Sequence, residues 1–350
     1  MKPFSCLFVL ACAAVLHADA IDDAVKKSME ADHVPGVCIA VVRPDDTTDI
    51  RSYGTANLEL GVKVTPDTVF RIASLSKQFC AMGVLTAKKA GKLELNQPIS
   101  KYLPEAPAAW KDITIRHLLN HTSGIKDPGN RFVITREYTA QQYVDLLASE
   151  PLETKPGEAY KYSSPGYTLL GIIVEKVMGK PLRQVVQEQI FDPIGMKSTS
   201  YFEMERIVAN RSGGYQWLDG KIANSQFLRP RIYDGSGGVM TSMNDLVKYE
   251  LALRHGPVPS KEMLAEMLTP GELNNGTKLT YGMGWGVNKI GDSRVVRHGG
   301  DTWGFTAYFI RDLTKNLTIL VLRNTGENKA ETLGRDIYDA AVKQFPKQKE

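Results

Sequence analysis

Short apolar runs of strand-forming residues gather at the two ends of this 350-residue chain and are scarce between them. These runs occupy residues 37–42, 50–54, 281–287, 294–297, 305–311 and 317–322. Because short links join the later runs, we expect their strands to pair antiparallel. The pattern therefore predicts an α+β fold, with an antiparallel sheet that is built from both chain ends.

Helical periodicity dominates the rest of the chain. The helical segments are residues 21–32, 74–90, 140–148, 167–178, 182–190, 243–253 and 329–345. We expect helices on the faces of the sheet and a mostly helical lobe over residues 91–234. The sheet lobe then consists of about residues 21–90 and 235–350, and a cleft between the lobes is the default ligand site.

The first twenty residues are typical of a secretory signal. Lys2 makes a basic start, residues 4–16 are almost wholly apolar, and residues 18–20 (Ala-Asp-Ala) form a small-x-small cleavage site. We expect cleavage after Ala20, one domain over residues 21–350, and a periplasmic or secreted location. A lipoprotein signal around Cys12 is the alternative. No other apolar run reaches the roughly 20 residues that a membrane span needs.

The charge of the chain and its cysteine and histidine residues indicate which ligands the protein does not bind. The chain has 43 basic and 39 acidic residues, a net charge of +4, and no polybasic tract, so we expect no nucleic-acid binding. Cys38 and Cys80 remain after the predicted cleavage, and both have the pattern of small core residues. His117 and His121 have a spacing that can bind zinc, but no third ligand is evident. We expect both histidines to be structural and the protein to use no metal and no organic cofactor.

Ser74 and Lys77 are the first candidates for chemistry, because on a helix a spacing of three places both on one face. A serine hydroxyl becomes a good nucleophile when a nearby base takes its proton. A lysine amine does so only if its pKa falls well below the ordinary value near ~10.4. The spacing alone is weak evidence, because Ser123 and Lys126 share it in a loop-like segment. An N-cap serine beside an exposed lysine explains the spacing equally well.

Two distant segments strengthen the case for catalysis. Residues 162–164 read Tyr-Ser-Ser before a predicted helix, and residues 298–300 read His-Gly-Gly between strand-like runs. With these motifs in this order, the chain resembles the serine β-lactamase and penicillin-binding protein superfamily. The resemblance is to its class C-like branch, which also holds DD-peptidases, D-aminopeptidases and β-lactamase-like esterases. Residues 61–77, 117–125 and 237–239 extend the likeness over nearly the whole mature chain.

The resemblance implies a role for each matched residue. Ser74 would be the acylated nucleophile and Lys77 its proton partner. Tyr162 would carry protons to the leaving group and activate the deacylating water. His298 would occupy the first position of the strand motif and would be a fourth catalytic residue. The backbone N–H groups of Ser74 and Asp301 would form the oxyanion hole, an arrangement that lowers the barrier by several kcal/mol in such enzymes.

Two departures from the β-lactamase pattern bear on the substrate. Ser164 stands where β-lactamases usually carry Asn, so it has a shorter reach and no amide donor. Residues 298–300 stand where β-lactamases carry Lys-Thr-Gly, so a fixed cation and a hydroxyl are missing. We expect Ser164, Gly299 and Gly300 to contact the substrate. The departures favour a short ester or a D-amino-acid peptide over β-lactams.

The sequence thus predicts an exported serine hydrolase that forms an acyl-enzyme at Ser74 with a small-molecule or peptide substrate. A class C-like β-lactamase or a DD-carboxypeptidase is an alternative within the same class. A non-catalytic penicillin-binding or ligand-sensing protein is the alternative from another class. Steady turnover of a short nitrophenyl ester, abolished by Ser74→Ala, separates an enzyme from a sensor.

Overall fold

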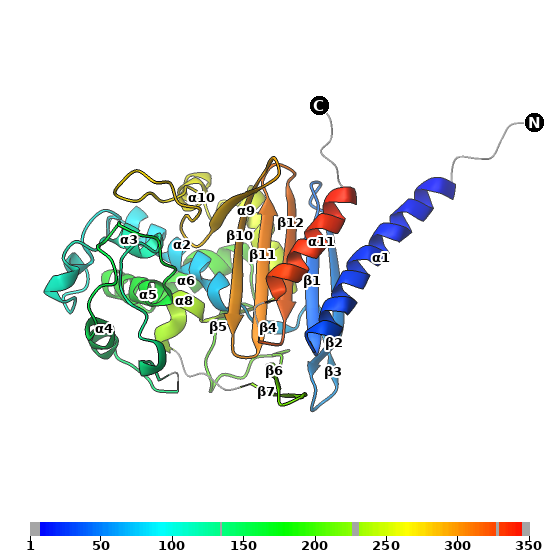
Figure 1. The fold of residues 1–350 in the computed structure, drawn as a ribbon, viewed down its shortest axis with the longest axis horizontal. Helices are drawn as coiled ribbons and strands as arrows, with labels where there is room; N and C mark the ends of the chain where they lie inside the picture. The colour runs from blue at the N-terminus through cyan, green and yellow to red at the C-terminus, as the bar shows by residue number, and fades with distance from the viewer. Residues whose placement is uncertain (1–7, 134, 226–230, 327–328, 345–350) are drawn as a thin grey trace, which may run out of the picture.

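A seven-stranded antiparallel sheet forms the centre of the molecule in the computed structural model, which describes residues 8–133, 135–225, 231–326 and 329–344 (Figure 1). The strand order is β3-β2-β1-β12-β11-β10-β9, so β1 from the N-terminal part pairs with β12 from the C-terminal part. The prediction of one antiparallel sheet built from both chain ends is confirmed. The strands are β1 (Gly36–Val42), β2 (Thr48–Asn57), β3 (Val62–Lys63), β9 (Gly286–Ile290), β10 (Ser293–Thr302), β11 (Phe305–Asp312) and β12 (Leu317–Arg323).

Two terminal helices cover one face of this sheet, as Figure 1 shows: α1 (Phe8–Ala31) and α11 (Ala330–Gln344). Side chains alternate between the two faces of a strand. Ile39 of β1 therefore packs in a cluster with Val25 of α1 and Ile337 of α11, whereas its neighbour Ala40 belongs to the core on the opposite face. This alternation explains why β1 is apolar at every position.

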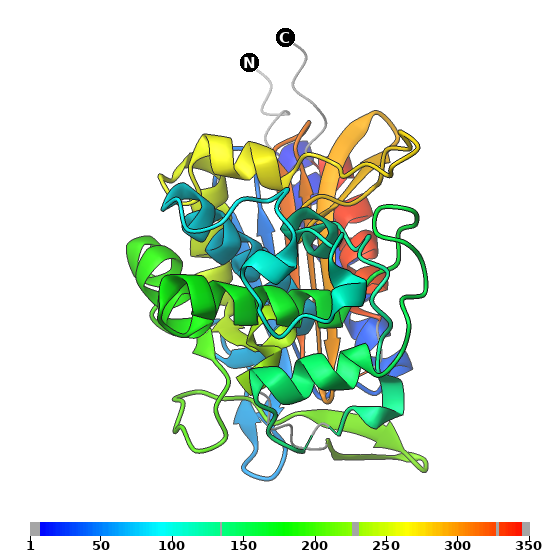
Figure 2. The ribbon, with the colours of Figure 1, turned by 90° about the vertical axis from the view of Figure 1, so that its left-hand side faces the viewer.

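The larger core lies on the opposite face, between the sheet and a group of helices that Figure 2 shows in front of the strands. Its centre is α2, whose residues are almost all buried. The remaining α-helices are α2 (Ser76–Lys89), α3 (Ile115–Leu119), α4 (Ala140–Ala148), α5 (Ser164–Met178), α6 (Leu182–Val186), α7 (Asp192–Ile194), α8 (Asp234–Gly237), α9 (Met243–His255) and α10 (Lys261–Met267). The predicted division into two lobes with those bounds stays a proposal.

Smaller elements complete the fold. Strands β4, β8 and β5 form a three-stranded sheet in that order, and β6 pairs with β7 in a hairpin. Their bounds are β4 (Val69–Arg71), β5 (Ser200–Tyr201), β6 (Tyr215–Leu218), β7 (Lys221–Asn224) and β8 (Val239–Ser242). Single turns are η1 (Ala73–Leu75), η2 (Ile99–Lys101), η3 (Ala108–Trp110), η4 (Gly129–Arg131), the π-helical η5 (Gln187–Phe191) and η6 (Arg231–Tyr233).

The structure differs from the predicted helices and strands at two places near Ser74. The helix expected from residue 74 begins as the 3-10 turn η1, because Ala73 has a positive φ of 48° and the α-helix starts only at Ser76. The strand expected over residues 281–287 begins only at Gly286, because Gly284 has a φ of 77° and turns the chain against the backbone of α2. In both cases the apolar sequence predicted a regular helix or strand, but contacts with distant parts of the fold impose a turn there.

The chain before β1 bears on the predicted export signal. Helix α1 covers residues 21–31 of the helix predicted over residues 21–32 and extends it back to Phe8. None of the helices among the described residues is long and apolar enough to cross a membrane. The predicted leader lies partly outside the described residues, and its cleavage stays a prediction.

Cys38 and Cys80 are buried and free, as their patterns predicted.

The turn that carries Ser74 lies directly against β10. A Cβ atom added to Gly300 would lie 2.2 Å from the carbonyl oxygen of Ile72 and 3.3 Å from the Cβ of Ala73. Real atoms do not approach so closely, so residue 300 must be glycine for β10 to reach this turn. The His-Gly-Gly motif thus has a packing role beside the serine turn.

We predict that Gly300→Ala lowers the unfolding free energy by about 1–3 kcal/mol, the usual cost of overpacking. We also expect it to slow covalent labelling of Ser74, because the turn or the strand must move apart. Thermal unfolding and labelling by a fluorophosphonate measure the two effects. Gly326→Ala is the control, since its added Cβ would meet its nearest atom at 3.5 Å. An unchanged labelling rate in Gly300→Ala would contradict this role.

Candidate active site

The structure brings Ser74 and Lys77 together at the start of α2. Strand β4 ends at Arg71, η1 then carries Ser74, and Lys77 lies in the first turn of the helix. The Nζ atom of Lys77 lies 3.0 Å from Oγ of Ser74, which is a hydrogen-bond distance. Ser74 stands just before the first turn of α2, and the free backbone N–H groups of a helix start favour negative charge nearby. The spacing seen in the sequence therefore corresponds to a direct contact.

The Lys77 amine is fully buried, and its other partners are oxygens without charge. Its Nζ lies 3.2 Å from Oγ of Ser164 and 2.9 Å from the carbonyl oxygen of Ser236. Burial disfavours the charged form and lowers the pKa of Lys77 from 10.5 to about 7. Near neutral pH, a substantial fraction of the amine is thus uncharged. In that form the amine accepts a hydrogen bond from Ser74 and can take its proton.

Tyr162 faces the same amine from the segment that precedes α5. Its ring centre lies 5.0 Å from Nζ of Lys77. The ring is 43% exposed, yet desolvation of the hydroxyl raises the pKa of Tyr162 above its ordinary value of 10. A hydrogen bond with Ser74 acts in the opposite direction but is the smaller effect. The phenol is therefore protonated at neutral pH and is placed to donate or pass on a proton.

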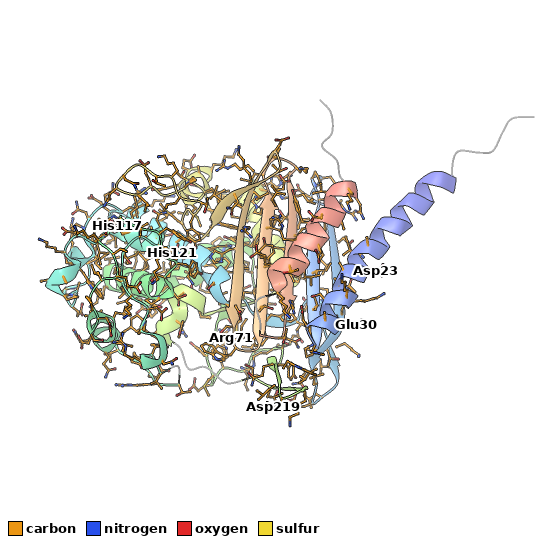
Figure 3. All side chains as sticks on the ribbon, viewed as in Figure 1. Asp23, Glu30, Arg71, His117, His121 and Asp219 are labelled. Carbon is orange, nitrogen blue, oxygen red and sulfur yellow. The ribbon has the colours of Figure 1, made fainter. Side chains whose placement is uncertain are left out.

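His121 holds the Tyr162 segment in position. Its Nδ1 accepts a hydrogen bond from the backbone N–H of Ser163 at 3.0 Å, and its carbonyl oxygen accepts one from Lys161 N at 2.8 Å. Its ring centre lies 4.4 Å from that of Tyr162. Burial, the largest cause, together with the nearby Lys77 charge, lowers the pKa of His121 well below 6.5, so the imidazole is neutral. These contacts give His121 a structural role, as the sequence predicted, and Figure 3 labels its place among the helices on this side of the sheet.

His298 lies on β10 with both ring nitrogens engaged. Nδ1 lies 2.6 Å from the carbonyl oxygen of Gly299, and Nε2 lies 2.9 Å from the hydroxyl of Tyr281. Because the carbonyl can only accept, Nδ1 carries the proton and Tyr281 donates to Nε2. Burial, with a smaller contribution from Lys77, lowers the pKa of His298 to about 3. The imidazole therefore supplies no positive charge at neutral pH.

A cavity of about 230 Å³ opens beside Ser74. It holds two other residues from the predicted site, Ser164 and Asp301, whereas Gly299 and Gly300 lie just before it on β10. The lining residues are Arg71, Ala73, Ser74, Asp127, Ser164, Tyr233, Ser236, Gly237, Asp301, Thr302 and Trp303. The place of Asp301 is compatible with the oxyanion-hole role that its backbone N–H is expected to have, and that role stays a proposal.

Sequence reasoning missed several residues of this site. Tyr281, which hydrogen-bonds to His298, looked like an ordinary strand residue. Ser236, which accepts from Lys77 through its backbone, carries no side-chain signal for that contact. Arg71 stands directly before the serine turn, but an arginine there resembles any exposed polar residue of a strand. These contacts join segments far apart in sequence, and only the fold reveals them.

The competing motifs have other roles in the structure. His117 lies in a capping box of α3, where its Nδ1 accepts from Thr114 N at 3.2 Å. Within the described part of the chain, no group of three His, Cys, Asp or Glu residues could hold a metal ion. Lys126 pairs with Glu150 at 2.9 Å, and Ser123 accepts from a nearby backbone N–H, so the second Ser-x-x-Lys match forms no contact pair.

The fold and the serine–lysine contact define a class: serine hydrolases with a lysine base beside the nucleophile. Comparison with known proteins gives the same class. The Beta-lactamase family model matches residues 21–344, and the chain belongs to this family. Penicillin-binding protein 4* of Bacillus subtilis (strain 168) is 30% identical over 300 residues. That match covers 79% of this chain, and the chain spans 65% of the length of that relative.

Solved structures agree with the family assignment. The D-amino acid amidase of Ochrobactrum anthropi SV3 superposes with a TM-score of 0.82 and 26% identity, covering 94% of this chain and 99% of the amidase. A penicillin-binding protein of Bacillus halodurans superposes with a TM-score of 0.78 and 25% identity, covering 91% of this chain and 98% of that protein. The fold predicted from the sequence is thus confirmed, and the structural likeness extends over more than nine-tenths of the chain.

The lowered pKa of Lys77 predicts a pH dependence for labelling of Ser74. Below the pKa the amine already holds a proton and cannot take another, so the rate of fluorophosphonate labelling should rise with pH, with its midpoint at about 7. Lys77→Met should slow labelling by roughly 10²–10⁴-fold and remove this rise. Lys126→Met is the matched control and should keep the midpoint. A midpoint near the ordinary lysine pKa would contradict the prediction.

Proposed function

We propose that the chain is an exported serine hydrolase that forms an acyl-enzyme at Ser74 on an ester or an amide. A short ester or a D-amino-acid peptide or amide is favoured over β-lactams. The observation that carries the proposal is the contact of 3.0 Å between Nζ of Lys77 and Oγ of Ser74, in a site whose burial lowers the lysine pKa to about 7. The N-terminal segment with its small-x-small site supports export.

In the acylation step, the neutral Lys77 amine takes the proton of Ser74 while the Ser74 oxygen attacks the substrate carbonyl. The carbonyl oxygen becomes negatively charged and would accept hydrogen bonds from the backbone N–H groups of Ser74 and Asp301. When the bond to the leaving group breaks, the protonated phenol of Tyr162 donates a proton to that group. The phenol then recovers a proton from the Lys77 ammonium, which restores both groups.

In the deacylation step, a water molecule attacks the acyl-enzyme from the side of Tyr162. The water proton passes through the phenol to the departing Ser74 oxygen, and the acid is released. Because the pKa of Tyr162 is raised, this residue acts as a neutral relay, and Lys77 is the group with a pKa matched to a base at neutral pH. This assigns the base to the lysine rather than to a phenolate.

In this mechanism we propose His298 as a positioning residue rather than as the catalytic residue that the resemblance implied. Both of its nitrogens are engaged by Gly299 and Tyr281, and its ring centre lies 6.0 Å from that of Tyr162. A neutral imidazole cannot replace the lysine that β-lactamases use to bind a substrate carboxylate at this position. Ser164 uses its hydroxyl to contact Lys77, and it has no amide with which to bind an acyl-amide group. These two substitutions support the preference against β-lactams.

The first experiment tests the acyl-enzyme. The mature protein is incubated with a fluorophosphonate and, separately, with labelled penicillin, and the modified peptide is identified by mass spectrometry. We expect an adduct at Ser74 with the fluorophosphonate and none in Ser74→Ala. Ser123→Ala is the matched control, because it removes the serine of the second Ser-x-x-Lys match. A folded protein that takes no adduct from either probe would contradict a serine nucleophile.

The second experiment tests the substrate class. Turnover is compared for p-nitrophenyl acetate and butyrate, D-amino-acid amides, a D-alanyl-D-alanine peptide and nitrocefin. We expect kcat/KM for an ester or a D-amino-acid amide to exceed that for nitrocefin by at least about 10²-fold, since specific contacts for the β-lactam are missing. Efficient cleavage of nitrocefin would favour a β-lactamase, and slow stoichiometric acylation without turnover would favour a sensor.

A further inference from the structure

One buried cation near Ser74 has no anionic partner among the residues that the structure describes. Arg71 is only 7% exposed, and among the described residues none accepts a hydrogen bond or forms an ion pair with its guanidinium. The group lies over the ring of Phe202, 4.6 Å from the ring centre. Burial lowers the pKa of Arg71 to about 10, so it keeps its charge at neutral pH. A buried, charged and unpaired group is costly, which points to a binding role.

The strand pattern places this charge beside the serine turn. In β4, Phe70 belongs to the large core, whereas Val69 and Arg71 lie on the other face, where Val69 packs with Phe202 and Met240. Figure 3 shows Arg71 near the lower end of the sheet. Arg71 lines the cavity of about 230 Å³ that contains Ser74, and it also lines an adjoining cavity of about 450 Å³. Arg71 and Ser74 thus border the same cavity.

The carboxylates around these cavities do not pair with Arg71. Glu59, in the larger cavity, is held by the hydroxyl of Tyr215 at 2.9 Å and by the amide of Asn224 at 2.7 Å. Asp127, in the cavity of Ser74, is exposed and accepts a backbone N–H. Asp301 of β10 lines the same cavity and is not without a partner of its own. The cavity therefore offers a ligand one buried cation and acidic groups at its more exposed parts.

We propose that Arg71 binds a carboxylate on the acyl part of the substrate, in the cavity beside Ser74. This inference rests on the proposed function, because it names the substrate class of the same site. The guanidinium presents a planar pair of N–H donors that matches a carboxylate. The substrate is then an ester or amide whose acyl chain carries a second, free carboxylate, such as a half-ester of a short dicarboxylic acid or an acidic acyl residue.

The acyl side is chosen because of where the proton donor lies. Tyr162, which is proposed to protonate the leaving group, does not line this cavity, and neither does His298. The leaving group therefore departs on the side of these two rings, and the acyl chain occupies the cavity with Arg71 and Trp303. His298 replaces the lysine of β-lactamases, so the leaving-group side of the site has no cation at this position. Arg71 supplies a cation on the acyl side instead.

The test compares matched anionic and neutral acyl chains. The probes are mono-p-nitrophenyl esters of succinic, glutaric and adipic acid, each paired with the p-nitrophenyl ester in which a methyl group replaces the carboxylate. The three lengths allow for the span between Ser74 and Arg71. We expect the wild-type kcat/KM to favour the anionic member at one length by roughly tenfold or more, as charge-assisted hydrogen bonds do. No preference at any length would overturn the proposal.

Variants then assign the preference to its residue. Arg71→Met should lower the ratio of anionic to neutral kcat/KM by about tenfold or more, and Arg71→Lys should retain part of it, because lysine keeps the charge but not the planar fork. Arg211→Met is the matched control, since Arg211 is exposed and, of these two cavities, lines the larger one and not the one with Ser74. A preference that survives Arg71→Met, or that is lost in Arg211→Met instead, would overturn the proposal.

The outcomes separate this inference from the proposed function. If neutral esters are turned over through Ser74 but anionic ones are not preferred, the hydrolase assignment holds and the role of Arg71 is wrong. If no ester or amide acylates Ser74, the proposed function fails, and the inference fails with it. If Arg71→Met does not fold, the wild-type ratio and Arg71→Lys still decide, because an unchanged ratio in Arg71→Lys excludes bidentate binding.

Discussion

The structure of the site depends on the burial of one amine among uncharged oxygens. Lys77 contacts Ser74, Ser164 and the backbone of Ser236, and none of these partners carries a negative charge. A carboxylate in that position would stabilise the ammonium and hold its pKa high. Because there is none, desolvation dominates and the amine can act as a base near neutral pH. The proposed chemistry of Ser74 therefore depends on the absence of a carboxylate among the hydrogen-bond partners of Lys77.

Three separate segments must meet to create this environment. Helix α2 carries Lys77, the start of α5 supplies Ser164, and α8 supplies the carbonyl of Ser236. Around them stand aromatic and imidazole groups that are neutral at physiological pH, among them His121 and Tyr162. They enclose the amine without adding charge to it. Arg71 lines both the cavity beside Ser74 and the larger cavity that adjoins it, whereas Lys77 lines neither, so the charge proposed for binding is separate from the amine that must lose its proton.

Much of the fold was predictable because apolar runs reveal buried strands and helical periods reveal helices. The Ser74–Lys77 contact was predictable because a spacing of three brings side chains together on any helix. The 3-10 start of that helix was not, since it depends on the positive φ of Ala73 and on β10 at Gly300. The hydrogen-bond partners of His298 and Lys77 could not be predicted either, because they come from segments that are far apart in the sequence.

A direct titration of the Lys77 amine tests the central claim. The protein is labelled with ¹³C at the lysine Cε, the Lys77 signal is assigned by its loss in Lys77→Arg, and its chemical shift is followed by NMR from pH 5 to 11, a range chosen to span the usual lysine and histidine pKa values of roughly 6.5 to 10.4. The account predicts a single signal that titrates at about 7, apart from the other lysines. A Lys77 signal that stays charged through neutral pH and titrates with the surface lysines would contradict it.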